Sequence, residues 1–270
     1  MRTKFFKTIF LFILIIQFSC DEPNVASDYF KPQIGDDFEW RLDSIGLEEV
    51  KDYHCKIIDI DAFSASKELV EAFHKQGIKV IAYISVGTIE NFRPDGALLP
   101  VEIIGNIYPD WPDERFLDIR QIDKLKPFIQ SRFDMIRDKG FDGIEPDNMD
   151  GYNEFNGFNL TVEDTRLFCE WIIDEAHSRG LCIGQKNTEE LVPLLYEKFD
   201  FALTEDVFNM NTQADYTPYI SSGKPVFSAE YTDVMSPAEF SNTVCPKAKT
   251  LNYFAFLKHR DLTRWTYECN

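Results

Sequence analysis

The sequence predicts an α/β fold of one domain, a (β/α)8 TIM barrel. Three observations lead to this prediction. The chain has 270 residues, which suits one barrel of ordinary size. Short apolar runs alternate with longer amphipathic stretches, which is the pattern of a parallel sheet covered by helices. Eight apolar runs can be counted, and eight is the number of strands that such a barrel needs.

Residues 1–19 have the pattern of an export signal. Three basic residues precede an apolar run at 9–16, which is shorter than the roughly 20 residues needed to span a bilayer. The run ends at Ser19-Cys20, which is similar to a bacterial lipoprotein signal, in which the cysteine is acylated and becomes the mature N-terminus. We therefore predict an exported protein held at a cell-envelope membrane by a lipid on Cys20, with ordinary secretion as the alternative.

The rest of the chain divides into a tether and a catalytic domain. Residues 20–36 are polar and contain proline and glycine, as expected of a tether, and residues 37–270 form the barrel. The predicted strands are residues 38–42, 56–61, 78–84, 141–147, 181–186, 199–205, 225–230 and 251–256. The predicted helices include residues 67–76, 122–139, 162–179, 188–198 and 237–247.

Glycine and proline residues indicate where the predicted helices start and end. Gly77, Gly140 and Gly180 stand where a helix ends before the next strand, and glycine suits the left-handed backbone of a helix cap. Pro127 predicts that the helix at 122–139 starts or kinks there. The proline-rich residues 85–120 are expected to form a long loop over the active-site end of the barrel, although an apolar piece at 116–119 could add a ninth strand.

Charge and cysteine content restrict the partners. The formal net charge of −18 argues against nucleic acid and anionic ligands and permits a cationic substrate. Of the five cysteines after Cys20, Cys245 and Cys269 are the preferred disulfide, because they flank the last helix and strand. No metal site and no cofactor is predicted, since there is no Cys-x2-Cys, the four histidines stand far apart, and no glycine-rich phosphate loop occurs.

Carboxylates end four of the predicted strands, where the active site of a parallel barrel opens. They are Asp59 and Asp61; Glu145 and Asp147, with Asp150 just beyond; Glu205 and Asp206; and Glu230. A carboxylate at the end of a buried strand is costly unless it is paired or used, so this pattern predicts a functional site. Alternation along the fourth strand places Glu145 and Asp147 on the same side.

A pair of carboxylates is what glycoside hydrolysis needs, because one donates a proton to the leaving oxygen while the other attacks or directs water. Lys186, at the end of the fifth strand, would moderate the repulsion within a crowded acidic site. Aromatic residues near the same end could stack on sugar rings; they are Tyr83, Trp111, Tyr152 and Tyr231. Trp40, on the first strand, is expected in the barrel interior.

An ordered set of segments resembles glycoside hydrolase family 114. The most specific is Glu-Pro-Asp-Asn-Met-Asp-Gly-Tyr at 145–152; the others are residues 58–60, 82–90, 93–95, 117–120, 184–187, Glu205 and Glu230-Tyr231. The resemblance implies an endo-acting hydrolase of α-1,4-linked galactosaminan, a cationic, partly deacetylated secreted or biofilm polysaccharide. It implies Asp147 and Glu205 as the catalytic pair. The substrate contacts expected beside them are Asp59, Tyr83, Glu90, Arg120, Glu145, Asp150, Tyr152, Lys186, Asn187, Glu230 and Tyr231.

Two other interpretations remain open at this point. A catalytically degenerate barrel could bind polysaccharide without cleaving it, although a binding module need not keep paired carboxylates. A barrel that uses Lys186 as a Schiff-base amine is disfavoured, because neighbouring carboxylates raise the pKa of a lysine while an amine nucleophile needs it lowered. The sequence leaves the stereochemical course open, with retention preferred.

Overall fold

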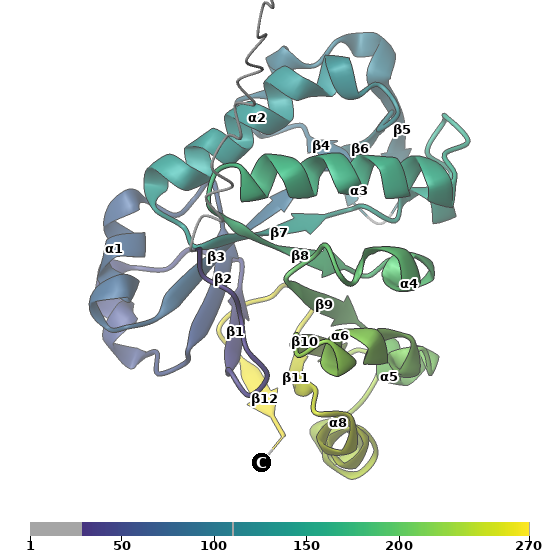
Figure 1. The fold of residues 1–270 in the computed structure, drawn as a ribbon. Coiled ribbons are helices and arrows are strands. Elements are labelled where there is room, and N and C mark those ends of the chain that lie inside the picture. The colour runs from purple at the N-terminus through teal and green to yellow at the C-terminus, as the bar shows by residue number, and fades with distance from the viewer. Residues whose placement is uncertain (1–28, 110, 270) are drawn as a thin grey trace, which may run out of the picture.

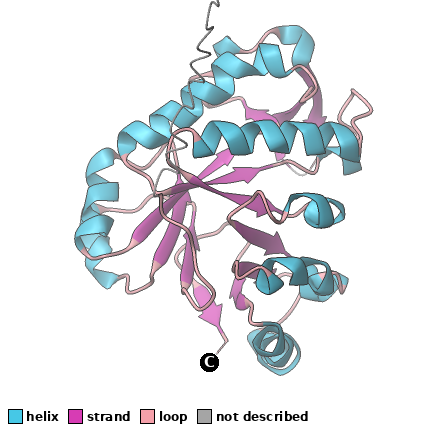
Figure 2. Cartoon of the chain, in the orientation of Figure 1, coloured by secondary structure: helices cyan, strands magenta, loops and turns pink. Residues whose placement is uncertain are grey.

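The computed structural model describes residues 29–109 and 111–269, so the predicted leader and Cys20 lie outside the described residues. Eight parallel strands follow one another around a barrel with helices outside (Figures 1 and 2). They are β1 (Phe38–Arg41), β2 (Ile57–Asp61), β3 (Lys79–Ser85), β7 (Gly143–Asp147), β8 (Cys182–Lys186), β9 (Phe201–Glu205), β10 (Val226–Tyr231) and β11 (Phe254–Lys258). The predicted barrel and its eight strands are confirmed.

Alternation along each strand separates two cores. Side chains that point inward, including Trp40, Leu203 and Phe227, pack together inside the barrel. Their neighbours point outward into a larger core between strands and helices. Two inward positions must be glycine: a Cβ at Gly143 would overlap the Cys182 sulfur, and one at Gly184 would overlap the Phe201 ring. The barrel interior is therefore filled below its open end.

The seam between the first and last strands differs from a fully paired barrel. Among the described strands, β1 pairs with β2 only, and β12 (Thr266–Glu268) joins the outer side of β11 in antiparallel sense. Side chains and loops close the gap instead: Lys258 Nζ lies 2.8 Å from Glu39 Oε1, and the Leu42 amide donates to the Leu262 carbonyl at 2.9 Å. The last barrel strand starts later than predicted, because the preceding helix continues to Leu251.

The long helices agree with the sequence. They are α1 (Lys67–Lys75), α2 (Ile122–Lys139) and α3 (Val162–His177). Gly77, Gly140 and Gly180 have φ of 81°, 90° and 72°, which confirms the predicted left-handed turns at the helix ends. The helix α2 neither starts nor breaks at Pro127, and buried residues on both sides of the proline hold it against the sheet.

Other predicted helices are interrupted. Residues 188–198 form η5 (Glu189–Leu191) and α4 (Val192–Leu195), and residues 237–247 fall in α7 (Pro237–Glu239), η7 (Phe240–Val244) and α8 (Cys245–Leu251). Prolines occupy the first turns of α4, α7 and α8, and the turn between α7 and α8 is a π-helix, so residues 237–251 stay helical without forming one regular α-helix. The remaining short helices are η1 (Leu47–Asp52), η4 (Gly151–Asn153), α5 (Val207–Met210), η6 (Gln213–Tyr216) and α6 (Thr217–Ser221).

The expected loop at 85–120 is largely a small antiparallel sheet, here called the roof sheet. It consists of β4 (Thr88–Glu90), β6 (Trp111–Leu117) and β5 (Ile104–Tyr108), in that spatial order, with η2 (Gly96–Leu98) and η3 (Val101–Ile103) between β4 and β5. In Figure 1 it lies beyond the end of the barrel to which β7 points. The apolar piece at 116–119 contributes to β6, so it adds no strand to the barrel.

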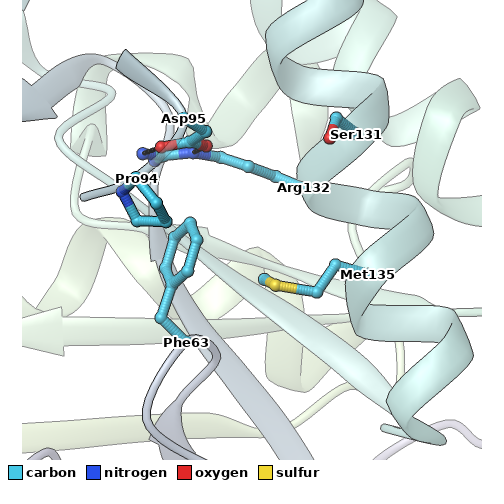
Figure 3. Close-up of a pocket in the computed structure, with 6 residues that line it drawn as sticks. All are labelled: Phe63, Pro94, Asp95, Ser131, Arg132 and Met135. Carbon is cyan, nitrogen blue, oxygen red and sulfur yellow. Dashed lines mark hydrogen bonds and ion pairs between the residues drawn. The ribbon is translucent and has the colours of Figure 1, made fainter. Parts of the chain in front are cut away.

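The predicted disulfide between Cys245 and Cys269 is present, and it ties α8 to the residue after β12. Figure 3 shows a small pocket outside the barrel, where Arg132 of α2 binds Asp95 with two nitrogens at 2.7 and 3.1 Å. Arg132 also donates to the Ser85 carbonyl at 2.6 Å, so its side chain fixes the end of β3 against α2. None of the described helices is long and apolar enough to cross a membrane.

Candidate active site

Lys186 occupies the centre of the open end of the barrel, hereafter the mouth. Its Nζ lies 2.7 Å from Glu145 Oε1, 2.9 Å from Asp147 Oδ1 and 3.3 Å from Glu205 Oε2. The ammonium also lies 4.6 Å from the centre of the Trp40 ring, which places Trp40 in the interior as predicted. Lys186 is only 2% exposed, so its charge is balanced by these carboxylates and little by water.

Asp147 and Glu205 are the two members of this group that open to the mouth, with side chains 19% and 26% exposed. Tyr83 donates to Asp147 Oδ2 at 3.0 Å. Tyr231 donates a short hydrogen bond to Glu205 Oε1, and Asn187 Nδ2 donates to Glu205 Oε2 at 3.1 Å. Each carboxylate is therefore held at both oxygens by groups from neighbouring strands.

Backbone contacts fix Asp147 at the end of β7. The Val86 amide donates to the Asp147 carbonyl at 3.0 Å. The next residue, Asn148, has φ of 62°. Its side-chain nitrogen Nδ2 donates to Ser85 Oγ at 3.0 Å and to Thr88 Oγ1 at 3.1 Å. A Cβ at Gly87 would overlap the Asn148 carbonyl oxygen, so only glycine allows this approach. The ends of β3 and β7 are thereby locked together.

The charges around Lys186 shift two pKa values in opposite directions, that of Lys186 upward and that of Glu205 downward. Burial lowers the pKa of Lys186, but Asp147, Glu145 and Glu205 outweigh it and raise the pKa well above its ordinary value. For Glu205, burial acts to raise the pKa, but Lys186 and the hydrogen bonds from Tyr231 and Asn187 bring it below its ordinary value. The resting site thus contains an ammonium and an ionised Glu205, which disfavours Lys186 as a Schiff-base amine.

Deeper carboxylates lie beneath the mouth. Asp59 and Glu145 are both fully buried, so neither reaches the open end where a substrate would bind. Burial, followed by the charge of Glu145, raises the pKa of Asp59 well above its ordinary value. Both residues were predicted as substrate contacts, which stays a prediction; in this structure Glu145 binds Lys186, and both oxygens of Asp59 lack a partner among the described residues.

Residues after β7 line the rim. Burial and the Asp147 charge raise the pKa of Asp150 to about 6. Tyr152 donates to Glu190 Oε2 at 2.7 Å, on the loop after β8. Trp111, at the start of β6, is 53% exposed. Asp150 and Tyr152 thus follow the strand that carries Asp147, whereas Trp111 belongs to the roof sheet, where it pairs with Tyr108.

Three predicted site residues are not brought into the group around Lys186. Glu90 accepts a hydrogen bond from Arg93 at 2.7 Å, and Arg93 also binds Asp61. Arg120 pairs with Asp118 at 2.7 Å. Glu230 points to the outer side of β10, because it alternates with the inward Ala229 and Tyr231, and it accepts from the Phe208 and Asn209 amides at 2.9 and 3.3 Å.

Other residues of the site were missed from the sequence. Glu114, from the roof sheet, accepts from Thr88 Oγ1 at 2.6 Å and from Asn148 at 3.3 Å; burial raises its pKa to about 7. The Arg260 guanidinium lies 4.1 Å from the centre of the Tyr231 ring and pairs with Asp206 at 2.8 Å. Burial raises the pKa of Tyr108, and the charges of Asp150 and Asp147 contribute. No group of three or more potential metal ligands occurs within the described part of the chain.

Comparison with known proteins assigns this arrangement to a family. The sequence model described as Glycoside-hydrolase family GH114 matches residues 21–270. The chain belongs to this glycoside hydrolase family. No curated protein sequence matched. Among solved structures, Ega3 of Aspergillus fumigatus in complex with galactosamine is 31% identical, with a TM-score of 0.83 over 89% of this chain and 97% of Ega3.

A second solved structure shares the fold of this GH114 chain. The glycoside hydrolase domain of PelA from Pseudomonas aeruginosa has a TM-score of 0.69 over 86% of this chain and 98% of that domain, at 14% identity. The family model and the match to Ega3 confirm the family resemblance drawn from the motif at 145–152, and the single-domain barrel is confirmed as well.

Proposed function

We propose that this GH114 chain is an endo-acting hydrolase of α-1,4-linked galactosaminan, and that Asp147 and Glu205 are its catalytic pair. One observation carries the proposal: both carboxylates contact the same ammonium while remaining open to the mouth. Because Asp147 Oδ1 and Glu205 Oε2 lie 2.9 and 3.3 Å from Lys186 Nζ, they are separated by no more than roughly 6 Å. That gap suits two groups acting on one glycosidic bond.

The separation also supports the stereochemical course. Carboxyl groups of retaining glycosidases lie about 5–5.5 Å apart, whereas inverting enzymes need roughly 6.5–9.5 Å to admit a water molecule. The limit set by Lys186 holds for one oxygen of each carboxylate, and it favours the shorter separation of a retaining enzyme. One carboxylate would therefore attack the anomeric carbon to form a glycosyl-enzyme, while the other gives a proton to the leaving oxygen and later takes one from water.

Charge supports a cationic polymer as the substrate. The net charge of −18 and the acidic rim around Asp150 would attract deacetylated amino sugars. The similarity to Ega3, whose structure contains galactosamine, supports the same sugar class. A binding-only barrel is less well supported, because both oxygens of Asp147 and of Glu205 are held in place by donors.

Proton NMR of the purified protein acting on partly deacetylated α-1,4-galactosaminan tests this function. We expect new reducing ends throughout the reaction and a rapid fall in polymer length, as an endo-acting enzyme produces. The first reducing ends should be in the α form, which retention from an α-linked substrate requires. Unchanged polymer would contradict the substrate, and β ends appearing first would contradict the retaining course.

We also propose that the protein is exported and anchored through a lipid on Cys20. The basic start, the short apolar run and Ser19-Cys20 support this location. In a bacterial host, the full chain should label with radioactive palmitate and sediment with membranes. Cys20→Ala should lose the label and leave the membrane fraction, whereas Cys55→Ala should keep both. Equal labelling of the two variants would contradict the anchor.

A further inference from the structure

Asp59 is a carboxylate of the barrel interior that receives no hydrogen bond from Lys186. A lysine ammonium has three N–H groups. Three carboxylate oxygens, from Glu145, Asp147 and Glu205, lie within 3.3 Å of Lys186 Nζ, which leaves no N–H for Asp59. Among the described residues, no donor reaches either oxygen of Asp59 or the second oxygen of Glu145. Both side chains are fully buried.

This arrangement is unfavourable if every carboxyl is ionised. Four carboxylates would then face a single ammonium, and a buried carboxylate without a donor or cation is costly. Two carboxyl groups that share one buried site avoid the cost when one of them keeps its proton. Asp59 and Glu145 are both fully buried, and each alters the pKa of the other, so the two carboxyls are neighbours. A proton on Asp59 would be donated to the unpartnered oxygen of Glu145. That proton would leave only the carbonyl oxygen of Asp59 without a partner.

We propose that Asp59 and Glu145 share one proton, and that this singly charged pair is a positioning device that holds Lys186 beneath Asp147 and Glu205. The surroundings of Asp59 agree with this proton. Glu145 and Asp147 face it from β7, Lys186 and the Cys182 thiol face it from β8, and Trp40 is its neighbour on β1. Burial, with Glu145 next in effect, raises the pKa of Asp59. The catalytic consequence rests on the proposed function, whereas the shared proton does not.

Variants of Asp59 separate a protonated carboxyl from an ionised one. Asp59→Asn keeps a neutral donor toward Glu145, so kcat should stay within about threefold of wild type, whereas Asp59→Leu, which removes the donor, should lower kcat about 100-fold with KM little changed. In wild type, kcat should fall at high pH as the pair loses its proton. Asp59→Asn cannot lose that proton, so its fall should move to higher pH.

A second measurement does not depend on activity. The infrared difference spectrum between wild type and Asp59→Asn at mildly alkaline pH should contain the C=O stretch of a protonated carboxylic acid in wild type. If wild type cleaves no galactosaminan, the proposed function fails while this band still tests the pair. Absence of the band, or an Asp59→Asn enzyme as slow as Asp59→Leu with an unshifted pH profile, would overturn the proposal.

Discussion

Asp147→Asn and Glu205→Gln should each lower kcat on galactosaminan at least about 1,000-fold, because in the proposed mechanism each removes a carboxylate that acts on the reacting bond. Both replacements keep side-chain size and a hydrogen-bonding group, so Tyr83 and Tyr231 retain partners. Reducing-end release at saturating substrate measures the effect. Thermal unfolding of each variant should remain close to wild type, which separates lost chemistry from lost structure.

A matched control is available on the same chain. Asp123→Asn makes the same chemical change on the outer helix α2, where the side chain is 96% exposed, and it should leave kcat unchanged. If Asp147→Asn or Glu205→Gln kept activity comparable to the Asp123→Asn control, the assignment of the pair would be incorrect. If both variants lose activity as expected, rescue by azide divides the roles, since the nucleophile variant should form an inverted β-azide and the acid/base variant a retained α-azide.

Lys186→Met should cost both activity and stability. Glu145, Asp147 and Glu205 would lose their common cation, and breaking a buried ion pair by removing one partner typically costs about 3–5 kcal/mol. The Tm should therefore fall, and kcat should fall at least about 100-fold because the two carboxylates that we propose as catalytic lose their common cation. Differential scanning calorimetry and the reducing-end assay measure these effects.

The stability loss in Lys186→Met should depend on pH in one direction. In wild type the lowered pKa of Glu205 contributes stability that is present above its unfolded pKa and lost as pH falls. Without Lys186, buried carboxylates should have raised pKa values, so the variant is least stable at high pH and recovers as they become protonated. The Tm difference should shrink toward acidic pH. A difference independent of pH, or an equal loss in the exposed control Lys126→Met, would contradict this account.

The fold could be predicted because its determinants are local. Buried apolar strands and the glycines after α1, α2 and α3 mark each β/α unit without reference to distant residues. The roof sheet could not be predicted, since β5 and β6 are partly exposed, carry no regular alternation of apolar and polar residues, and are fixed by their pairing. The seam beside β1 was missed for a similar reason: Lys258 and Glu39 are far apart in sequence and meet only in the folded barrel.

In the site, too, the residues that local sequence indicates could be predicted, and those brought in by distant segments could not. Asp147, Lys186 and Glu205 could be predicted because each ends a barrel strand, and the active site of a parallel barrel opens where its strands end. The prediction also included Glu230, which lies one residue out of phase with the inward Tyr231 and so faces the helices. Alternation counted back from Tyr231 could have excluded it. Glu114, Arg260 and Tyr108 come from the roof sheet and a loop, where no periodic pattern indicates direction.

The crystal structure of the Glu205→Gln variant with a galactosamine oligosaccharide tests the central claim most directly. A single glycosidic oxygen should lie between the side chains at positions 147 and 205. An Asp147 oxygen should face the anomeric carbon while the introduced glutamine amide lies within hydrogen-bonding distance of the bridging oxygen, or the two roles should be exchanged. An oligosaccharide bound elsewhere, or a bond that only one of these side chains can reach, would contradict the account.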